Sequence, residues 1–473
     1  MKVIFAKLIA LFMAFLMTVT GLQMSVVGFT DGEPIVPEER EYKFDRDRLL
    51  IGGYYADYDE LDYCKDAGVE FIIAGGVDKA YLDKAQSLGV GIIASNLNVP
   101  YAYADFYDGT RDAYVNYDPA NYFDHPALWG DNVIDEPKAD AYDNLGAAVN
   151  AYNEKLTAKY GVLPFVNLFP AYASAEEQLT EPISLTPLQK MLGLVNDNGL
   201  DWMDAYKAYT SDYINKIDTD YICVDIYPYR AELTAAGRRK KTTEGTWLRN
   251  LDVLAEACRA TGRDLWVIPQ AAGLTENGTK GGDMRWTDEV SDISQQAYAS
   301  LAFGAKAIIH GLFGKAGWWD MDSHMIGSNG LPTATYYAAA EVDSYLKAFA
   351  EEYGKYEYTS TYLMKPTACA GFGAGTLNCE IPEEEGNIAS LAALCIGTFT
   401  GADGAKAYIV TNMEELDKEK TAPFTFTVAD GATVTVYRKG EISTYTDDFR
   451  IALEPGEGVF ITADKVEQPT ILC

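Results

Sequence analysis

The sequence predicts a (β/α)8 barrel of the α/β class followed by an antiparallel β-sandwich. Eight short runs rich in Val and Ile recur between residue 49 and about residue 351, with longer helical patterns between them. After residue 353 the pattern changes to alternating apolar and polar residues separated by Gly, Asp and Asn turns. At 473 residues the chain is long enough for a barrel, which can reach about 250 residues, and a second domain.

The strand candidates are apolar on both faces, which is typical of buried parallel strands. They are Leu49–Tyr55, Val69–Gly75, Val90–Ser95, Asn132–Asp135, Leu163–Leu168, Tyr221–Tyr227, Leu265–Gln270 and Ala307–Phe313. The helical patterns between and after them cover Asp59–Ala67, Ala80–Leu88, Ala141–Tyr160, Trp202–Ile217, Gly245–Thr261, Glu289–Phe303 and Thr335–Tyr353.

Eight such units favour a closed barrel over an open, doubly wound sheet. No GxGxxG or GxxxxGK[ST] motif follows any of the strands, so a nucleotide-binding open sheet has no support. The C-terminal runs, such as Ala407–Thr411 and Phe424–Val428, are typical of strands in a sandwich of about 115 residues. The basic run at 238–241 is expected to be a solvated loop.

The N-terminus has the features of a secretory signal. Lys2 and Lys7 precede the apolar run from Leu8 to Val19, which is shorter than the ~20 residues of a membrane-spanning helix. An uncleaved anchor is the alternative. The predicted organisation is a signal peptide at 1–30, a linker at 31–44, a barrel at 45–353 and a sandwich at 354–473. We therefore expect a secreted or cell-surface protein with no membrane insertion after cleavage.

Charge and composition narrow the partners. A net charge of −32 argues against nucleic acid, whose binding needs a basic face. The 33 Tyr and 7 Trp offer rings that can stack on sugars instead. No cofactor is expected, and three His and seven scattered Cys leave little room for a metal site. Nothing in the sequence indicates an oligomeric state.

The strongest candidate for chemistry is the pair Asp135–Glu136 at the end of the fourth strand. In a barrel, functional residues lie at the C-terminal ends of the strands. Two adjacent carboxyl groups repel each other, and burial raises the pKa of one, so that it can deliver a proton near neutral pH. Pro137 turns the chain at once and leaves Glu136 at the rim. The alternative is an acidic cap on the following helix.

Other strand ends supply candidates for binding. Asp225 ends the sixth strand and could be a base, a nucleophile or an acceptor for sugar hydroxyls, or could pair with an Arg. Candidate sugar contacts at the remaining ends are Tyr55, Asn167, Tyr227, Gln270, His310, Trp318 and Trp319. Each also has a structural alternative, such as a hydrogen-bonded core role for His310 and packing against the sandwich for the Trp pair.

The barrel region resembles the superfamily of retaining barrel glycoside hydrolases. The stretch from His125 to Pro137, the Asp225-Ile-Tyr-Pro segment and the strand-eight segment 302–308 carry the resemblance, which covers roughly residues 45–350. It implies that Glu136 is the general acid/base. Two departures stand out: Asp135 replaces the usual Asn, and the seventh strand ends in Gln270 instead of the nucleophilic Glu.

Three hypotheses account for these departures. An inverting enzyme would pair Glu136 with Asp225 at a separation of about 6.5–9.5 Å. A substrate-assisted enzyme of the N-acetylhexosaminidase type would use Asp135 to hold a 2-acetamido group that attacks internally. A non-catalytic barrel would only bind glycans. The sugar, the linkage and exo or endo action are not predicted.

Overall fold

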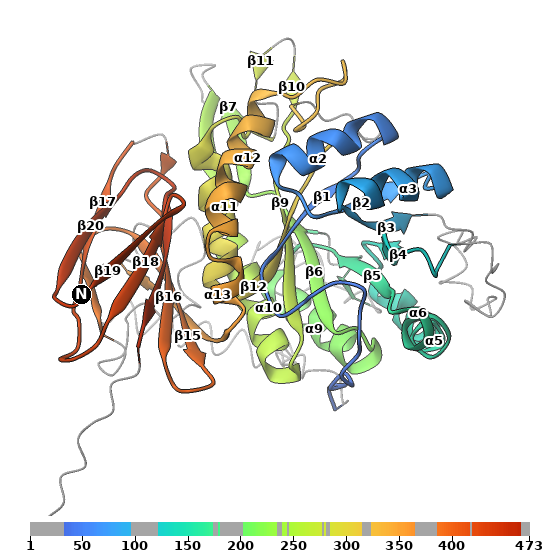
Figure 1. Cartoon of the computed structure of the whole chain (residues 1–473), viewed down its shortest axis with the longest axis horizontal. Helices are drawn as coiled ribbons and strands as arrows, with labels where there is room; N and C mark the ends of the chain where they lie inside the picture. The colour runs from blue at the N-terminus through green and yellow to red at the C-terminus, as the bar shows by residue number, and fades with distance from the viewer. Residues whose placement is uncertain are drawn as a thin grey trace, which may run out of the picture.

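The computed structural model describes residues 33–95, 122–173, 178–179, 202–233, 239–243, 246–276, 279–280, 284–314, 323–364, 386–416 and 419–464. Figure 1 shows a barrel surrounded by helices and, beside it, a smaller β-domain built from the C-terminal part of the chain. The signal-peptide prediction for residues 1–30 lies outside the described residues.

Eight parallel strands form a closed ring in the order β1-β12-β9-β6-β5-β4-β3-β2. Their bounds are β1 (Leu50–Tyr54), β2 (Phe71–Gly75), β3 (Gly91–Ser95), β4 (Leu128–Asp135), β5 (Leu163–Leu168), β6 (Tyr221–Ile226), β9 (Asp264–Pro269) and β12 (Ala305–His310). The predicted barrel is confirmed, and each strand overlaps its predicted range. β4 begins at Leu128, before the predicted Asn132.

The helices cover the outside of this ring. They are α2 (Leu61–Ala67), α3 (Lys79–Leu88), α5 (Tyr142–Tyr152), α6 (Ala158–Tyr160), α9 (Trp202–Lys216), α10 (Trp247–Thr261), α11 (Val290–Ala302), α12 (Ala334–Lys347) and α13 (Ala350–Tyr353), with 3-10 turns η1 (Tyr58–Glu60) and η2 (Ala139–Ala141). A π-helical turn, η3 (Asn153–Thr157), joins α5 to α6 where one helix was predicted. In the described parts of the chain, no helix has the length and apolarity needed to cross a bilayer.

Large rings fill the barrel interior, and glycines make room for them. A Cβ at Gly52 would lie 2.4 Å from the Phe71 ring, and one at Gly91 would lie 2.1 Å from the Trp129 ring. Alternation along each strand sends every second side chain inward. The same alternation brings Asn167 of β5 and Asp225 of β6 to the inner face at the C-terminal end.

The C-terminal domain is the predicted β-sandwich. One sheet has the order β13-β15-β16-β21-β18-β19 and the other β14-β17-β20. The strands are β13 (Tyr356–Met364), β14 (Ile388–Ser390), β15 (Leu394–Gly401), β16 (Lys406–Asn412), β17 (Ala422–Phe426), β18 (Val434–Arg438), β19 (Glu441–Tyr445), β20 (Phe449–Leu453) and β21 (Gly458–Ala463). Apolar residues of both sheets form its core.

The six-stranded sheet packs its other face on α11 of the barrel. Gln295 of α11 donates to the carbonyl of Asn412 at 3.0 Å. Phe460 of β21 lies 5.0 Å from Phe349, ring centre to ring centre. A single apolar cluster includes Phe460 together with barrel residues. The two domains therefore share a core instead of being joined by a flexible linker.

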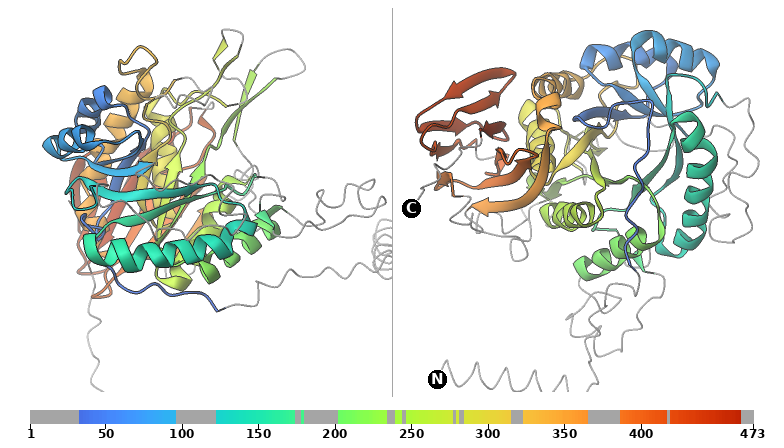
Figure 2. Two further views of the ribbon diagram at one scale, coloured as in Figure 1. Left: turned by 90° about the vertical axis from the view of Figure 1, so that its right-hand side faces the viewer. Right: turned by 60° about the horizontal axis from the view of Figure 1, so that its bottom comes forward.

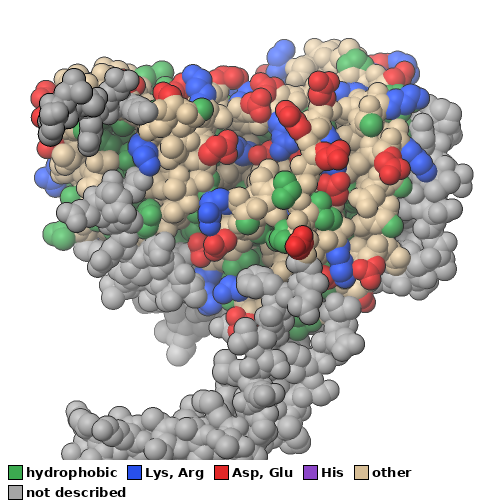
Figure 3. Space-filling view, turned by 90° about the horizontal axis from the view of Figure 1, so that it is seen from below, with side chains coloured by type: hydrophobic (Ala, Val, Ile, Leu, Met, Phe, Trp, Pro, Cys, Tyr) green, Lys and Arg blue, Asp and Glu red, His purple; other side chains and the backbone are tan. Residues whose placement is uncertain are grey.

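The segment from residue 33 to β1 lies across the N-terminal end of the barrel (Figure 2, right). Phe44 stacks on Trp129 at 4.8 Å between ring centres. Arg40 pairs with Asp218 and Asp220, and Arg46 pairs with Asp264 at 2.7 Å. The segment predicted as a linker thus closes the barrel floor, because an open ring end would expose the interior rings. Figure 3 views this face, where acidic and basic side chains intermingle.

Two hairpins stand at the opposite, C-terminal end. They are β7 (Tyr229–Leu233) with β8 (Arg239–Thr243), and β10 (Thr275–Glu276) with β11 (Thr279–Lys280). Both project beyond the barrel in Figure 2 (left). The basic run predicted as a loop is thus largely strand β8, because it pairs with β7 in a ribbon that extends past the strand ends.

Candidate active site

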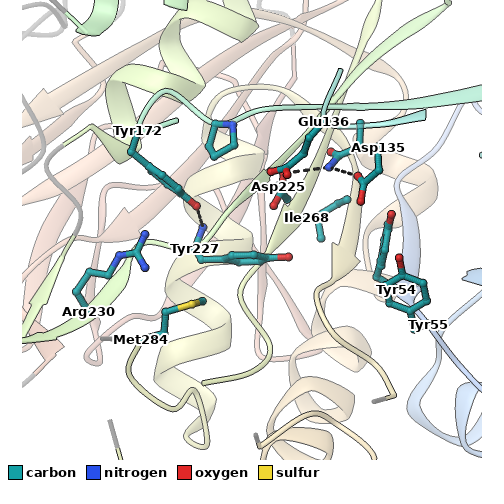
Figure 4. A pocket seen from close by; sticks show the side chains of 12 residues that line it. Tyr54, Tyr55, Asp135, Glu136, Tyr172, Asp225, Tyr227, Arg230, Ile268 and Met284 are labelled. Carbon is teal, nitrogen blue, oxygen red and sulfur yellow. Dashed lines mark hydrogen bonds between the residues drawn. The ribbon is translucent and has the colours of Figure 1, made fainter. Parts of the chain in front are cut away.

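A pocket of about 370 Å³ opens at the C-terminal mouth of the barrel. Its size is at the lower end of the range typical of small-molecule sites, about 300–1,000 Å³. The twelve residues that line it are Tyr54, Tyr55, Asp135, Glu136, Asn167, Pro170, Tyr172, Asp225, Tyr227, Arg230, Ile268 and Met284. Figure 4 shows the acidic groups and Tyr54 and Tyr55 on one side of Tyr227, and Arg230 and Met284 on the other.

One amide joins two of the acidic side chains at the base of the pocket. The Nδ2 of Asn167 donates to Asp135 Oδ1 at 2.9 Å and to Asp225 Oδ1 at 3.0 Å. The two carboxylate oxygens therefore lie within about 6 Å of each other. The pairing of neighbouring strands produces this arrangement. Asp135 of β4 lies opposite Asn167 of β5, and Asn167 lies opposite Cys223 of β6, two residues before Asp225.

The environment of this pair favours retention of a proton. The pKa of Asp225 is raised to about 7, first because burial disfavours its charged form and then because Asp135 carries like charge. Burial also raises the pKa of Asp135, and hydrogen bonds from Asn167 and Tyr54 offset part of the rise. Asp135 is exposed on the open side of the pocket, whereas Asp225 is buried.

Glu136 lies at the rim beside this pair. Its backbone is in the left-handed region, with φ of 48°, which non-glycine residues rarely adopt. The N–H of Glu136 donates to the carbonyl of Asn167 at 2.9 Å, and Pro137 follows directly. The side chain is half-buried and lines the pocket. Left-handed backbone at a non-glycine residue is a feature that clusters at functional sites.

Four tyrosines form the walls. Tyr54 and Tyr55 of the β1 end contact edge to face at 4.4 Å, and Tyr55 is also left-handed, with φ of 61°. The backbone N–H of Tyr227 donates to the hydroxyl of Tyr172 at 3.1 Å. Burial raises the pKa of Tyr227 well above its usual value, and the charges of Asp225 and Asp135 add to the rise. These hydroxyls therefore stay protonated and can donate to a ligand.

The far side of the pocket is built by the hairpin segments. Arg230 lies 5.1 Å above the ring of Tyr172. Met284 reaches the pocket because it forms a β-bridge with Arg230. This side combines a guanidinium with an apolar thioether, whereas the bottom of the pocket carries carboxyl groups.

The structure brings together six of the ten site residues predicted from the sequence: Tyr55, Asp135, Glu136, Asn167, Asp225 and Tyr227. Trp318 and Trp319 lie outside the described residues. Tyr54, Tyr172 and Arg230 were not predicted, although each is near a predicted residue in a strand-end segment. Met284 has no such signal, because only the pairing of two distant loops brings it here.

Gln270 and His310 are not at the pocket, and their placement corrects the prediction. Gln270 is fully buried, and its amide donates to the carbonyls of Ala272 and Arg285 at 3.0 and 2.7 Å. Ile268 faces the pocket from β9 in its place. His310 follows the inward Ile309, so it faces the helices and bonds Asp343 of α12 at 2.8 Å.

In the part of the chain that the structure describes, no group of three or more His, Cys, Asp or Glu side chains has a geometry that could hold a metal ion. The polar groups that line the pocket are carboxyl, amide, phenol and guanidinium groups.

The sequence matches no family model and no curated protein. Among solved structures it is similar to a β-galactosidase from the Antarctic haloarchaeon Halorubrum lacusprofundi, with 12% identity over 67% of this chain and 60% of that chain and a TM-score of 0.39. A GH27 β-L-arabinopyranosidase from Geobacillus stearothermophilus has 9% identity over 90% of this chain and 98% of its own, with a TM-score of 0.40.

A β-galactosidase from Bacillus circulans sp. alkalophilus has 9% identity over 90% of this chain and 100% of its own, with a TM-score of 0.44. Likeness this distant carries no argument about substrate or mechanism. The fold assignment rests on the closed strand order, and the chemistry rests on the pocket.

Proposed function

We propose that the protein is a glycoside hydrolase whose active site is the pocket at the barrel mouth. The observation that carries the proposal is the convergence of three carboxyl groups, Asp135, Glu136 and Asp225, in one cavity walled by tyrosines. Glycosidic bonds are cleaved by pairs of carboxyl groups, one of which donates a proton to the leaving oxygen. Tyrosine rings offer apolar faces and hydroxyls suited to sugar rings.

In the mechanism we favour, Glu136 protonates the glycosidic oxygen and Asp225 acts as the base. Asp225 removes a proton from water while the water oxygen bonds to the anomeric carbon, and the bond to the leaving group breaks with the proton from Glu136. A base is most effective when its pKa lies near the working pH, and the pKa of about 7 for Asp225 meets this condition. The product would have inverted configuration.

Asp135 and Tyr227 would assist this step. A negative charge on Asp135 beside the pocket stabilises the oxocarbenium-like transition state. The protonated hydroxyl of Tyr227 can hydrogen-bond a sugar hydroxyl or orient a carboxylate. Asn167 keeps Asp135 and Asp225 at a set separation through its two hydrogen bonds.

A substrate-assisted reaction is the second candidate, and the fixed orientation of Asp135 favours it. Asn167 and Tyr54 both hydrogen-bond this carboxyl next to Glu136. In that case Asp135 would accept the N–H of a 2-acetamido group whose oxygen attacks the anomeric carbon, and the product would retain its configuration.

The test is hydrolysis of a panel of aryl glycosides that includes N-acetylated sugars, with product stereochemistry followed by NMR. We expect cleavage with inversion, and Glu136→Gln should lower kcat about 10²–10⁴-fold while the fold is unchanged by circular dichroism. Retention confined to 2-acetamido sugars would replace the first mechanism by the second. Full activity of Glu136→Gln would reject the assignment of Glu136.

The non-catalytic alternative has a distinct signature. A glycan-binding barrel would bind sugars equally well as wild type and as Glu136→Gln, and neither protein would release reducing ends. That result would overturn the enzymatic proposal.

We also propose that the protein is exported, because residues 1–30 combine a basic start with a short apolar run. N-terminal sequencing of the protein from culture medium and from cells would test this. We expect a mature chain that begins between residues 21 and 31. A chain that keeps Met1 and stays with the cells would contradict export by cleavage.

A further inference from the structure

The loops that carry Glu136 and Tyr172 are held from behind by buried side chains that do not reach the pocket. Glu136 and Pro137 follow β4, and residues 169–172 follow β5. Their backbone polar groups need partners, because a buried unpaired N–H or carbonyl is unfavourable. Helices α9 and α10 supply them.

Tyr209 of α9 links the two loops through a single hydroxyl. It donates to the carbonyl of Pro137 at 2.7 Å and accepts from the N–H of Phe169 at 3.3 Å. The side chain is fully buried. Its position therefore depends on α9 and not on any ligand.

Asn250 of α10 extends this support to the second loop. Its Oδ1 accepts from the N–H of Ala171 at 2.6 Å, and its Nδ2 donates to the hydroxyl of Tyr206 at 2.8 Å. Tyr206 in turn stacks with Tyr209 at 6.1 Å between ring centres. Both loops are thus tied to one buried network on two helices.

Such support matters most at Glu136, whose left-handed backbone is unfavourable for a side-chain-bearing residue. On one side the N–H of Glu136 bonds Asn167, and on the other the carbonyl of Pro137 bonds Tyr209. Loss of the second bond would allow the turn to relax and would move the carboxyl away from the reacting oxygen.

We infer that Tyr209 is a positioning residue that sets Glu136 for proton transfer without touching the substrate. The inference rests on the proposed function of Glu136. A displacement of about 1 Å at a reacting group can lower the rate about 100-fold. Because Glu136 would act mainly in the transition state, kcat should fall while KM changes little.

Tyr209→Phe removes only the hydroxyl, and Tyr213→Phe is the matched control. Tyr213 lies one turn further along α9, is equally buried, and bonds Thr219 at 2.9 Å, away from both loops. We expect Tyr209→Phe to lower kcat about 10- to 100-fold with KM nearly unchanged. Tyr213→Phe should lower the melting temperature comparably and leave kcat at the wild-type value.

Amide hydrogen exchange measures positioning without any activity. Tyr209→Phe should speed exchange in peptides that cover residues 133–138 and 168–173, and Tyr213→Phe should not. Equal kcat values for the two variants, or unchanged exchange in both loops, would overturn the inference. If wild type cleaves nothing on the panel, the proposed function fails, and the exchange comparison still decides whether Tyr209 holds the loops.

Discussion

The carboxyl groups at the bottom of the pocket show how a single residue can lower the free energy of unfolding of this protein. Asp225 is only 8% exposed and sits within reach of a second carboxyl, so its ionisation is disfavoured in the folded protein. Its folded pKa is above that of the unfolded chain, so the folded state binds the extra proton between about pH 4 and pH 7. The free energy of unfolding should therefore fall as the pH rises through this window. A group that lowers stability in this way is a strong candidate for function.

The Asp135 charge provides a test of the coupling. In Asp135→Asn the like charge that raises the pKa of Asp225 is gone, whereas its burial remains. We expect the acidic limb of the kcat/KM profile, near pH 7 in wild type, to move to lower pH even if the maximal rate falls. Asp140→Asn, at an exposed position nearby, is the control. An unmoved limb in Asp135→Asn would mean that Asp225 is not the group that titrates.

Gln270 occupies the position at which the resemblance to retaining glycoside hydrolases would place a nucleophilic Glu, and its contacts allow a prediction. Its amide donates to two carbonyl oxygens in a fully buried site. A carboxylate at this position would face those oxygens unpaired, so Gln270→Glu should destabilise the protein by about 3 kcal/mol or more. Denaturant unfolding measures this, and the exposed Gln86→Glu should be near neutral. A Gln270→Glu variant that gains retaining hydrolysis would contradict this placement.

For single residues, the sequence predicted the pocket lining correctly where a polar residue both ends an apolar strand and points into the barrel. Asp135, Asn167 and Asp225 end apolar strands and point inward, which is why they could be predicted as a site. Gln270 and His310 also end strands, but their contacts depend on which loop or helix packs behind them. That information is not contained in the local pattern.

The N-terminal segment, from residue 33 to β1, is held to the barrel by ion pairs that cannot be recognised from the sequence. Arg40 is 14% exposed and pairs with Asp218 and Asp220, and Tyr42 also bonds Asp220. Without Arg40, Asp218 would lose its ion pair, and Asp220 would keep only the longer pair with Arg46 at 3.8 Å. The segment therefore contributes to the barrel although it contains neither helix nor strand.

Arg40→Ala should lower the free energy of unfolding by about 2 kcal/mol, which is less than the 3–5 expected for a fully buried pair. The specific activity of the folded protein should not change, since the segment lies at the opposite end of the barrel from the pocket. Lys79→Ala removes a surface pair with Asp83 that is mostly exposed, so it should cost under about 1 kcal/mol. Chemical denaturation of both variants measures these two losses of unfolding free energy. Equal, small effects would show that the segment is only loosely attached.

The hairpin β7–β8 shows why some elements escape prediction. Strand β8 has the sequence RKKTT, without an apolar residue, and covers most of the basic run 238–241 that was predicted to be a loop. A strand of this composition lacks the apolar alternation by which strands are recognised in a sequence. Their pairing is apparent only when both halves of the ribbon are placed together.

The whole molecule behaves as two domains with one shared core. Gly397 of β15 lies so close to α11 that a Cβ there would be 2.2 Å from the carbonyl oxygen of Ala302. This contact leaves no space between the sandwich and the barrel. Unfolding of one domain should therefore expose the apolar face of the other.

Gly397→Ala should destabilise the whole chain by about 1–3 kcal/mol, because backbone must move to admit the methyl group. We expect a single calorimetric transition that shifts to lower temperature. Gly75→Ala is the control, because a Cβ at Gly75 has no neighbour within 4 Å. Two separate transitions, with only one displaced, would show that the domains unfold independently.

The amino-acid sequence alone determined the fold class and showed that carboxyl groups end apolar strands, because runs that are apolar on both faces and strands that alternate are local patterns in the chain. Only the tertiary structure decided which strand ends share a cavity, that Asn167 bridges two carboxyls, and that Gln270 and His310 bond buried partners outside the pocket lining. These outcomes depend on contacts between segments far apart in the chain, and no local pattern specifies such contacts.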